Sequence, residues 1–326
     1  MLGTRGGGGS TGTPGSDWGG RVTTTARPIP RSILYTPASS LERVLTARSH
    51  DADVHLIDLE DSVPASAKRD AREICRVALE RSPNLRNAAV RINPLSSIES
   101  VHDLAMLTAT PAKPGFVFMT MVRFAAEPKL LRDMLASADW HPEIFVTVET
   151  VEAVDEVDGI AAESDGLILG SADLAATLGI DINWAGLLAA RQAMALACAR
   201  HESACIDTGN FQLADPSILR EEIEQARSLG FHGKGTVHPK ELEAINRGFR
   251  PSDAEIKEAR RVMEAVHAAG DGVTLVDGRM VGPPFVRKAR MTLARGEAWS
   301  ARYGKDSPAS PGPATGTTQH ATTETT

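Results

Sequence analysis

Short apolar runs alternate with longer segments of helical period along most of this chain. The runs are rich in β-branched residues and are continuously apolar, which is typical of strands in a covered parallel sheet. The segments between them have recognisable ends: Asp215 and Pro216 open one helix, and Gly230 closes it. Eight such runs follow Arg31, at 32–37, 54–61, 88–93, 116–121, 144–150, 166–170, 203–207 and 235–239.

Eight strand–helix units predict an α/β fold of the (β/α)₈ TIM barrel type. An open, doubly wound sheet is the alternative, and it usually carries a glycine-rich phosphate turn after its first strand. Here the first run ends in Thr-Pro-Ala-Ser-Ser at 36–40, without that turn. The pattern therefore favours the closed barrel.

The barrel accounts for only part of the 326 residues. Both ends of the chain are rich in Gly, Pro or Thr, and they carry too little apolar surface to offset the entropy of ordering them. After the eighth strand, Ser252 and Glu255 form a capping box that opens a helix, and a second helix follows a short turn. The predicted parts are a disordered Gly-rich tail at 1–29, a catalytic TIM barrel at 30–248, a C-terminal helical extension at 249–303 and a disordered Pro/Thr-rich tail at 304–326.

Charge and composition narrow the class of protein. The chain has 35 basic and 42 acidic residues, a net charge of −7, and its basic residues are scattered. We therefore expect neither nucleic acid nor a membrane surface as partner. The chain has no run of ~18 apolar residues, and its three cysteines have no metal spacing, so we expect a soluble, cytoplasmic protein.

Polar residues at the ends of the apolar runs are the candidates for chemistry, because active sites of parallel barrels lie at the carboxyl ends of the strands. Several carboxylates there would repel one another in a low dielectric, and a hard cation would relieve that repulsion. Oxygen ligands favour Mg²⁺, with Mn²⁺ also possible. The candidates are Asp58, Glu60, Asp61, Arg91, Asn93, Glu149, Asp173, Asp207 and His238.

Structural roles remain open for several of these residues. Glu149 could be held by a lysine or a helix N-terminus, and Asp173 could be the N-cap of the following helix. Arg91 could grip a substrate carboxylate or form an ion pair with Asp58 or Asp61. A lone histidine before proline, such as His238, is more often a structural hydrogen-bonding group.

The motifs, taken in order, resemble those of a known family. The chain is similar to the citrate lyase β-subunit-like branch of the HpcH/HpaI aldolase superfamily, which includes malyl-CoA and citramalyl-CoA lyases. The resemblance covers about 31–296 and implies a modified TIM barrel that assembles as a homotrimer or a dimer of trimers. The motifs are ILYTPASSLERV, VHLIDLEDSVPASAKRDAR, VRINPLS, VTVETVEAV, LILGSADLAATLG, GKGTVHPKELEAIN and DGRMVGPPFVRKAR.

The resemblance also implies roles for particular residues. Glu149 and Asp173 would be the Mg²⁺ ligands, and Arg91 would bind the carboxylate of the oxo acid. Glu60 and Asp61, in the DLED motif, would order water or other groups around the metal, with Asp61 as a candidate base. Lys68 falls where the family has a basic residue and would face the phosphates of CoA.

Three segments depart from the family pattern. Tyr35-Thr36-Pro37-Ala38 replaces a Phe-Val-Pro-Gly type turn, and Met119-Thr120-Met121-Val122 replaces a Pro-Lys followed by a carboxylate. At the C-terminal turn, Gly282 stands where many members carry the Asp of Met-Ile-Asp. These departures concern the half of the site that serves the thioester.

Three hypotheses follow. The first is a Mg²⁺-dependent carbon–carbon lyase that cleaves or forms a 3-hydroxy-acyl-CoA from an acyl-CoA and a 2-oxo acid. The second is a non-CoA aldolase of the same superfamily. The third is a catalytically impaired accessory subunit in a biosynthetic complex. The sequence leaves open the identity of the oxo acid and of the acyl partner, the direction of the reaction and the number of subunits.

Overall fold

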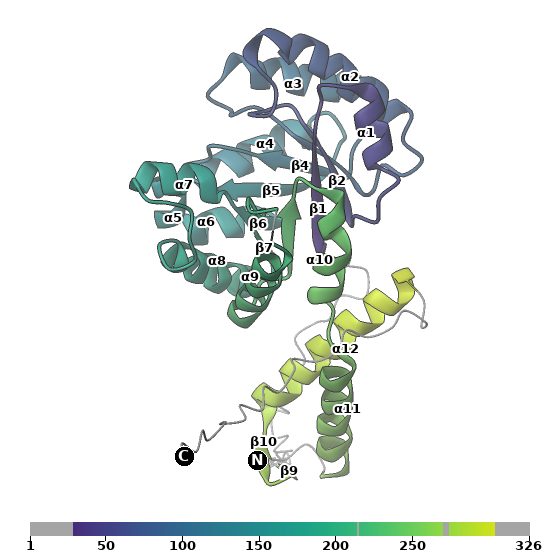
Figure 1. Cartoon of the computed structure of the whole chain (residues 1–326), viewed down its shortest axis with the longest axis vertical. Helices are drawn as coiled ribbons and strands as arrows, with labels where there is room; N and C mark the ends of the chain where they lie inside the picture. Colours follow the sequence, from purple (N-terminus) through teal and green to yellow (C-terminus); the bar gives the residue numbers. More distant parts are fainter. Residues whose placement is uncertain (1–28, 214, 270–273, 304–326) are drawn as a thin grey trace, which may run out of the picture.

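The structure, a computed structural model, describes residues 29–213, 215–269 and 274–303. The two predicted tails lie outside the described residues, apart from Ile29. Everything described belongs either to a barrel or to the helical extension that follows it (Figure 1).

Eight parallel strands close into a barrel in the order of the sequence, and the last strand pairs with the first. This confirms the predicted (β/α)₈ TIM barrel. The eighth strand begins two residues earlier than predicted, because Lys234 is fully buried within it instead of preceding it. The strands are β1 (Ser32–Pro37), β2 (Val54–Asp58), β3 (Ala88–Arg91), β4 (Phe116–Met119), β5 (Glu143–Val148), β6 (Gly166–Leu169), β7 (Ala204–Asp207) and β8 (Gly233–Thr236).

Helices cover the outside of this barrel (Figure 1). Asp215 caps the helix after β7 and Gly230 ends it with a left-handed turn, as predicted. The helices are α1 (Leu41–Ala47), α2 (Lys68–Glu80), α3 (Ile98–Ala109), α4 (Ala126–Ala136), α5 (Val151–Asp155), α6 (Val157–Ala162), α7 (Ser171–Leu178), α8 (Leu188–His201), α9 (Pro216–Leu229) and α10 (Leu242–Gly248), with 3₁₀ turns at Ala65–Ala67 and Pro239–Glu241.

Large aromatic rings fill the barrel interior beneath the mouth. Phe118 and Phe145 stack with ring centroids 5.0 Å apart, and Phe116 meets Phe145 edge-on at 5.6 Å. Gly166 on the next strand makes room for them, because a Cβ there would lie 2.5 Å from the Phe145 ring. This packed aromatic layer lies directly below the polar residues at the strand ends.

A buried ion cluster joins the barrel to its outer helices. The Lys234 ammonium lies 2.9 Å from Asp207 Oδ2 and 2.9 Å from Glu222 Oε2. Arg191 Nε donates to Asp207 Oδ1 at 3.0 Å. The expectation that Asp207 faces the mouth is therefore wrong, because it is fully buried in ion pairs with cations from β8 and α8.

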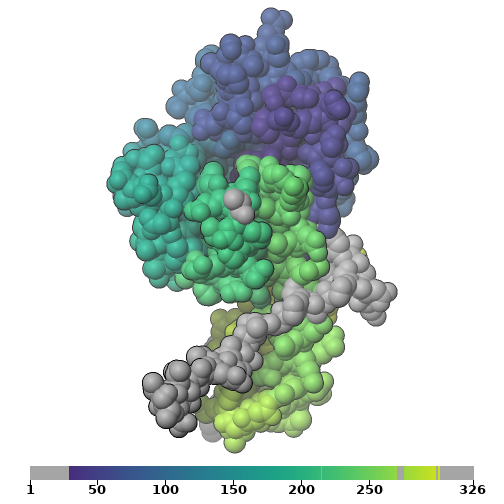
Figure 2. Space-filling model, in the orientation of Figure 1, coloured from purple at the N-terminus to yellow at the C-terminus, as the bar shows by residue number. Residues whose placement is uncertain are grey.

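The extension follows α10 and forms a lobe beneath the barrel (Figure 2). It consists of α11 (Asp253–Ala268), an antiparallel hairpin of β9 (Thr274–Val276) and β10 (Arg279–Val281), and α12 (Pro283–Tyr303). The predicted capping box of Ser252 and Glu255 is present at the start of α11. Assembly into trimers stays a prediction. Among the described helices, none is both long enough and apolar enough to span a membrane.

His232 lies just before β8 and is held in its neutral form. Its Nδ1 accepts a hydrogen bond from the Cys205 amide at 3.0 Å. Burial, together with the nearby Arg295 charge, lowers the pKa of His232 to about 3. Since the unfolded side chain titrates near its ordinary value of 6.5, the unfolded chain binds a proton below pH 6.5 that the folded chain rejects.

We therefore expect His232 to make folding sensitive to mild acid. Between pH 7 and pH 5 its contribution should lower the free energy of unfolding by about 1–2 kcal/mol. His232→Asn keeps an acceptor near the position of Nδ1 but does not titrate, so it should lose less stability over this interval. Urea unfolding of both proteins at pH 7 and pH 5 measures the difference, and equal losses would contradict the assignment.

Candidate active site

Arg91, the last residue of β3, is clamped by two carboxylates at the barrel mouth. Its Nε and Nη2 donate to the two oxygens of Asp58 at 2.7 and 2.6 Å, and its Nη1 lies 3.2 Å from Glu60 Oε2. The guanidinium also lies 5.4 Å from the centre of the Tyr35 ring. The ion pair with Asp58, one of two alternatives from the sequence, is therefore present, and a grip on a substrate carboxylate stays a prediction.

This clamp fixes the protonation of Asp58. Burial disfavours the charged carboxylate, but the hydrogen bonds and charge of Arg91 outweigh it and hold the pKa of Asp58 below its usual range. Asp58 therefore stays ionised and cancels much of the Arg91 charge. The remaining carboxylates at the mouth have less positive charge to offset them.

Glu60 and Asp61 lie in the loop after β2 and differ in exposure. Glu60 is buried, and burial raises its pKa to about 7 even though Arg91 opposes the shift. Its Oε2 has no hydrogen-bond partner among the described residues, apart from the ion pair with Arg91. Asp61 is exposed at the rim. A water-ordering or basic role for either residue stays a prediction.

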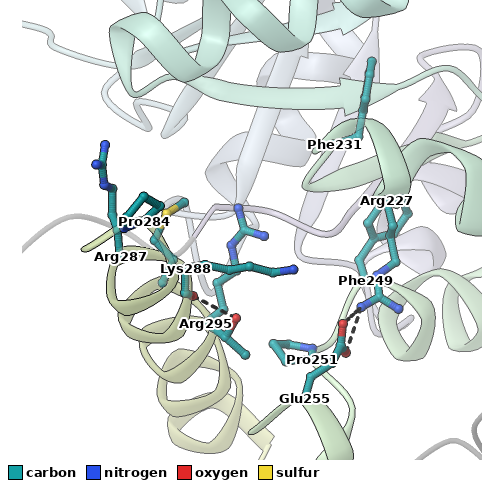
Figure 3. Close-up of a pocket in the computed structure, with 11 residues that line it drawn as sticks. Arg227, Phe231, Phe249, Pro251, Glu255, Pro284, Arg287, Lys288 and Arg295 are labelled. Carbon is teal, nitrogen blue, oxygen red and sulfur yellow. Dashed lines mark hydrogen bonds and ion pairs between the residues drawn. The ribbon is translucent and has the colours of Figure 1, made fainter. Parts of the chain in front are cut away.

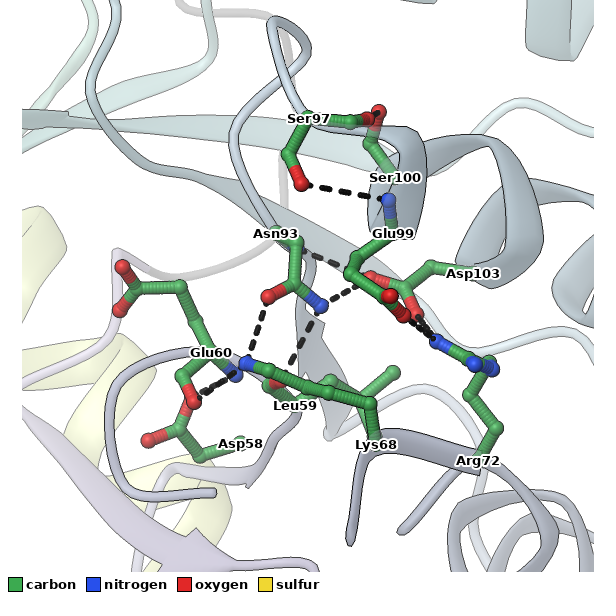
Figure 4. A network of polar contacts seen from close by, with 10 residues as sticks. All are labelled: Asp58, Leu59, Glu60, Lys68, Arg72, Asn93, Ser97, Glu99, Ser100 and Asp103. Carbon is green, nitrogen blue, oxygen red and sulfur yellow. Dashed lines mark hydrogen bonds and ion pairs between the residues drawn. The ribbon is translucent and has the colours of Figure 1, made fainter. Parts of the chain in front are cut away.

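Lys68 supports this loop from the start of α2, as Figure 4 shows. Its ammonium donates to Leu59 O at 2.7 Å, to Glu60 O at 2.8 Å and to Asn93 Oδ1 at 2.6 Å. These bonds occupy all three donors of the ammonium. Contact with CoA phosphates stays a prediction, and it would require one of these bonds to be exchanged.

Asn93, expected at the mouth, is turned into the same network. Its side-chain amide donates to Asp103 Oδ2 at 2.7 Å and to Leu59 O at 3.1 Å. Asp103 in turn pairs with Arg72 at 3.2 Å. The expectation that Asn93 faces the mouth is therefore wrong, because its hydrogen-bonding groups tie the β2 loop to α3.

Glu149 follows β5 and has a buried carboxyl group. Its Oε1 accepts a hydrogen bond from the Met121 amide at 2.6 Å. Burial raises the pKa of Glu149 to about 8, with the amide opposing this shift and the charges of Asp173 and Glu60 adding to it. Burial is therefore the main reason for the raised pKa, and a cation bound at this carboxylate would favour its charged form.

Asp173 lies in the first turn of α7 and is exposed. The N-cap of α7 is Gly170, and this cap has no side-chain hydrogen bond. Asp173 therefore does not cap the helix, which was its structural alternative. Its charge contributes to the raised pKa of Glu149.

The donor set fits a hard divalent cation. Glu149 and Asp173 offer carboxylate oxygens from two adjacent strand ends, with Glu60 nearby. No group of three or more His, Cys, Asp or Glu residues with metal-binding geometry occurs in the described part of the chain. One or two carboxylates completed by water and substrate oxygens is the usual arrangement for Mg²⁺.

Gly170 lets Glu149 take its position. A Cβ at residue 170 would lie 2.4 Å from the Glu149 Cβ and 2.6 Å from its Oε2. The sequence analysis missed this role, although a glycine directly after an apolar run was a visible signal.

Met121 holds Glu149 from the other side through an unusual backbone. Its φ is 52°, in the left-handed region that non-glycine residues seldom adopt, and this conformation accompanies the amide bond to Glu149. No pattern in the sequence predicted this left-handed backbone at Met121.

Tyr35 is a further residue that the sequence analysis did not assign to the site. It points into the barrel beneath Arg91, and burial raises the pKa of its hydroxyl well above the usual range. Side chains alternate between the two faces of a strand, and Tyr35 is two residues after Ile33 in β1, so both point into the barrel. This spacing could have identified Tyr35 as a residue of the site. His238, by contrast, has a structural role, since its Nδ1 accepts from the Lys240 amide at 3.2 Å.

A sequence model of the family described as HpcH/HpaI aldolase/citrate lyase matches residues 31–239. The chain belongs to the HpcH/HpaI aldolase/citrate lyase family. The match spans β1 to β8 and includes the carboxylates described above.

Relatives in this family carry different activities in their names. The chain is 34% identical to a (3S)-malyl-CoA thioesterase of Cereibacter sphaeroides, over 83% of this chain and 96% of the relative. It is 29% identical to the citrate lyase subunit beta of Escherichia coli, over 82% and 93%. Among solved structures, CitE from Mycobacterium tuberculosis in complex with magnesium, acetoacetate and coenzyme A matches with a TM-score of 0.71 and 27% identity, over 83% of this chain and all of that one.

The close approach at Gly170 gives a direct test of the site. Gly170→Ala should displace Glu149, destabilise the fold by about 1–3 kcal/mol and weaken Mg²⁺ binding. Gly179→Ala is a useful comparison for stability, because nothing lies within 4 Å of a Cβ there, although φ is +69°. It should cost stability without weakening Mg²⁺ binding in calorimetry; equal loss of binding in both variants would contradict the role of Gly170.

The backbone at Met121 gives a second test. Met121→Gly keeps the amide and removes the cost of a left-handed residue, about 1 kcal/mol. Met121→Val also keeps the amide, but its β-branch resists this conformation. We expect Mg²⁺ titration to show weaker binding for Met121→Val than for Met121→Gly, and unfolding to show lower stability. Indistinguishable variants would show that this backbone does not position Glu149.

Proposed function

We propose that this chain is a Mg²⁺-dependent carbon–carbon lyase of the citrate lyase β-like type. Its substrates would be 3-hydroxy-acyl-CoA thioesters of the malyl, citramalyl or citryl kind, cleaved to or formed from an acyl-CoA and a 2-oxo acid. The observation that carries the proposal is the buried Glu149, which accepts a hydrogen bond from the Met121 amide at 2.6 Å and whose pKa is raised by burial and by the charges of Asp173 and Glu60. The names of the relatives supply the substrate class.

Glu149 and Asp173 would hold the metal, leaving its other positions for water and for the substrate's carboxylate and hydroxyl oxygens. When bound, Mg²⁺ supplies Lewis-acid polarisation of the oxygen at the reacting carbon. The protein's part is to keep the carboxylates in place: Gly170 gives Glu149 its room, and the Met121 amide aims it. Arg91, fixed by Asp58, would orient the carboxylate of the substrate.

Cleavage needs a base for the 3-hydroxyl group. Asp61, exposed at the rim, would take that proton, with Glu60 next to it in the DLED loop. The C2–C3 bond then breaks, its electron pair moves to the carbon beside the thioester, and a proton added there completes the acyl-CoA. The hydroxyl carbon becomes the carbonyl of the oxo acid. Condensation follows the same steps in reverse.

Thioester hydrolysis is a second candidate, favoured by the 34% identity to a malyl-CoA thioesterase. In that reaction water attacks the thioester carbonyl and the C–S bond breaks, which releases free CoA. In both reactions the same residues would bind the carboxylate of the substrate, so only the products distinguish the two. A non-CoA aldolase and an accessory subunit remain the alternatives that Thr120 and Gly282 motivate.

Product analysis tests these functions together. Malyl-CoA, citramalyl-CoA and citryl-CoA are incubated with the protein and Mg²⁺, and free thiol, acyl-CoA and oxo acid are measured. The proposed lyase gives equal amounts of acyl-CoA and oxo acid without free thiol. Glu149→Gln should lower this turnover at least about 100-fold, because it removes a charge that binds the metal.

The control is Glu224→Gln, on the exposed surface of α9. It should keep full turnover. Release of free CoA and a hydroxy acid would show that the activity is thioester hydrolysis and not the proposed lyase reaction. Unchanged turnover in Glu149→Gln would refute the metal site. Turnover of hydroxy-oxo acids without CoA would indicate the non-CoA aldolase. The absence of turnover together with the absence of metal-dependent oxo-acid binding would indicate the accessory subunit.

A further inference from the structure

A cavity of about 530 Å³ lies where the extension meets the barrel, and we call it the junction pocket. Residues from α12, the end of α9 and the segment between α10 and α11 line it (Figure 3). Phe231 in its wall lies two residues before the start of β8, so the pocket lies at the amino-terminal end of the strands. Glu149 lies at the carboxyl-terminal end, and the two sites are therefore separate.

The walls of the junction pocket are strongly basic. Arg227, Arg287, Lys288 and Arg295 line it, and Glu255 is its one acidic residue. Helix α12 as a whole has five basic residues and one acidic residue, in a chain whose net charge is −7. Positive charge is therefore concentrated here against the overall balance of the chain.

Little of this positive charge is neutralised. Glu255 is already used, because its carboxylate accepts from Arg227 at 3.0 and 3.1 Å and from the Ser252 amide at 2.7 Å. Among the described residues, no carboxylate forms an ion pair with Lys288 or Arg295. Figure 3 shows the Lys288 ammonium and the Arg295 guanidinium pointing into the space between α12 and the barrel, while Arg287 points away.

The pKa of Arg295 is lowered mainly by its partial desolvation, and the repulsion between Arg295 and Arg227 across this space adds to the shift. An anion between Lys288, Arg295 and Arg227 would relieve this repulsion through charge-assisted hydrogen bonds. The other part of the wall is apolar, with Phe231, Phe249 and Met291. The volume is within the usual range for small-molecule sites.

We propose that the junction pocket binds a phosphate-bearing small molecule with an aromatic or apolar moiety, of about nucleotide size. Lys288 and Arg295 would contact the phosphates, and the moiety would lie against the exposed side chain of Met291 in the apolar part of the wall. Arginine recognises phosphate in two-pronged geometry, and an apolar side chain buries the surface of the moiety. A ligand here would contact both the barrel and the extension and would stabilise their junction.

Calorimetry with inorganic pyrophosphate and ADP tests this proposal, in buffer with EDTA so that no metal site takes part. We expect saturable binding with a Kd below about 1 mM, and ADP to bind more tightly than pyrophosphate. The double variant Lys288→Glu/Arg295→Glu should weaken both ligands at least about ten-fold. The control is Arg290→Glu, an exposed cation of α12 outside the lining, which should bind like the unaltered protein.

Three outcomes would overturn the proposal. The first is that neither probe shows saturable binding. The second is that the double variant, shown to be folded by its melting temperature, binds the probes as well as the unaltered protein does. The third is that citrate, which carries no phosphate, binds with the same affinity as the probes. Because no turnover is measured and no metal is present, failure here is independent of the proposed lyase activity.

Discussion

The balance of charge at the barrel mouth is the constraint on which the rest of the site depends. Asp58 and Glu60 both pair with one guanidinium, that of Arg91. Asp58 binds it through two short hydrogen bonds, and the pKa of the nearby Glu149 is raised by burial and further by the charges of Asp173 and Glu60. Such an arrangement lowers the stability of the fold, and carboxylates arranged in this way commonly bind a cation.

The scaffold maintains this arrangement by steric means. Phe118 and Phe145 fill the interior below the mouth, and Gly166 and Gly170 on the adjacent strand leave the space that Phe145 and Glu149 occupy. Lys68 and Asn93 hold the DLED loop through backbone carbonyls, so the position of Glu60 does not depend on its own carboxylate. The geometry is therefore set before any ligand arrives, which is the basis of electrostatic preorganisation.

The sequence predicted the barrel well because eight apolar runs separated by helices have few other solutions. It was less successful in identifying which polar residues belong to the site, because the end of an apolar run does not show whether a side chain points to the mouth or to the outer helices. Asp207 and Glu149 both end a strand, yet Asp207 points outward into ion pairs and Glu149 points to the mouth. The left-handed backbone of Met121 depends on tertiary contacts, and no local pattern encodes it.

The two ends of the barrel carry opposite charge, and their separation lets both persist. Strands of four to six residues span roughly 13–20 Å between the mouth and the opposite end of the barrel, beyond the Debye length of ~8 Å at physiological salt. Carboxylates at one end therefore do not neutralise Lys288 and Arg295 at the other. Were the extension attached at the mouth of its own barrel, its basic helix would compete with the proposed metal for Glu149 and Asp173. Attachment after α10, which returns the chain to the amino-terminal end, avoids this competition within one chain.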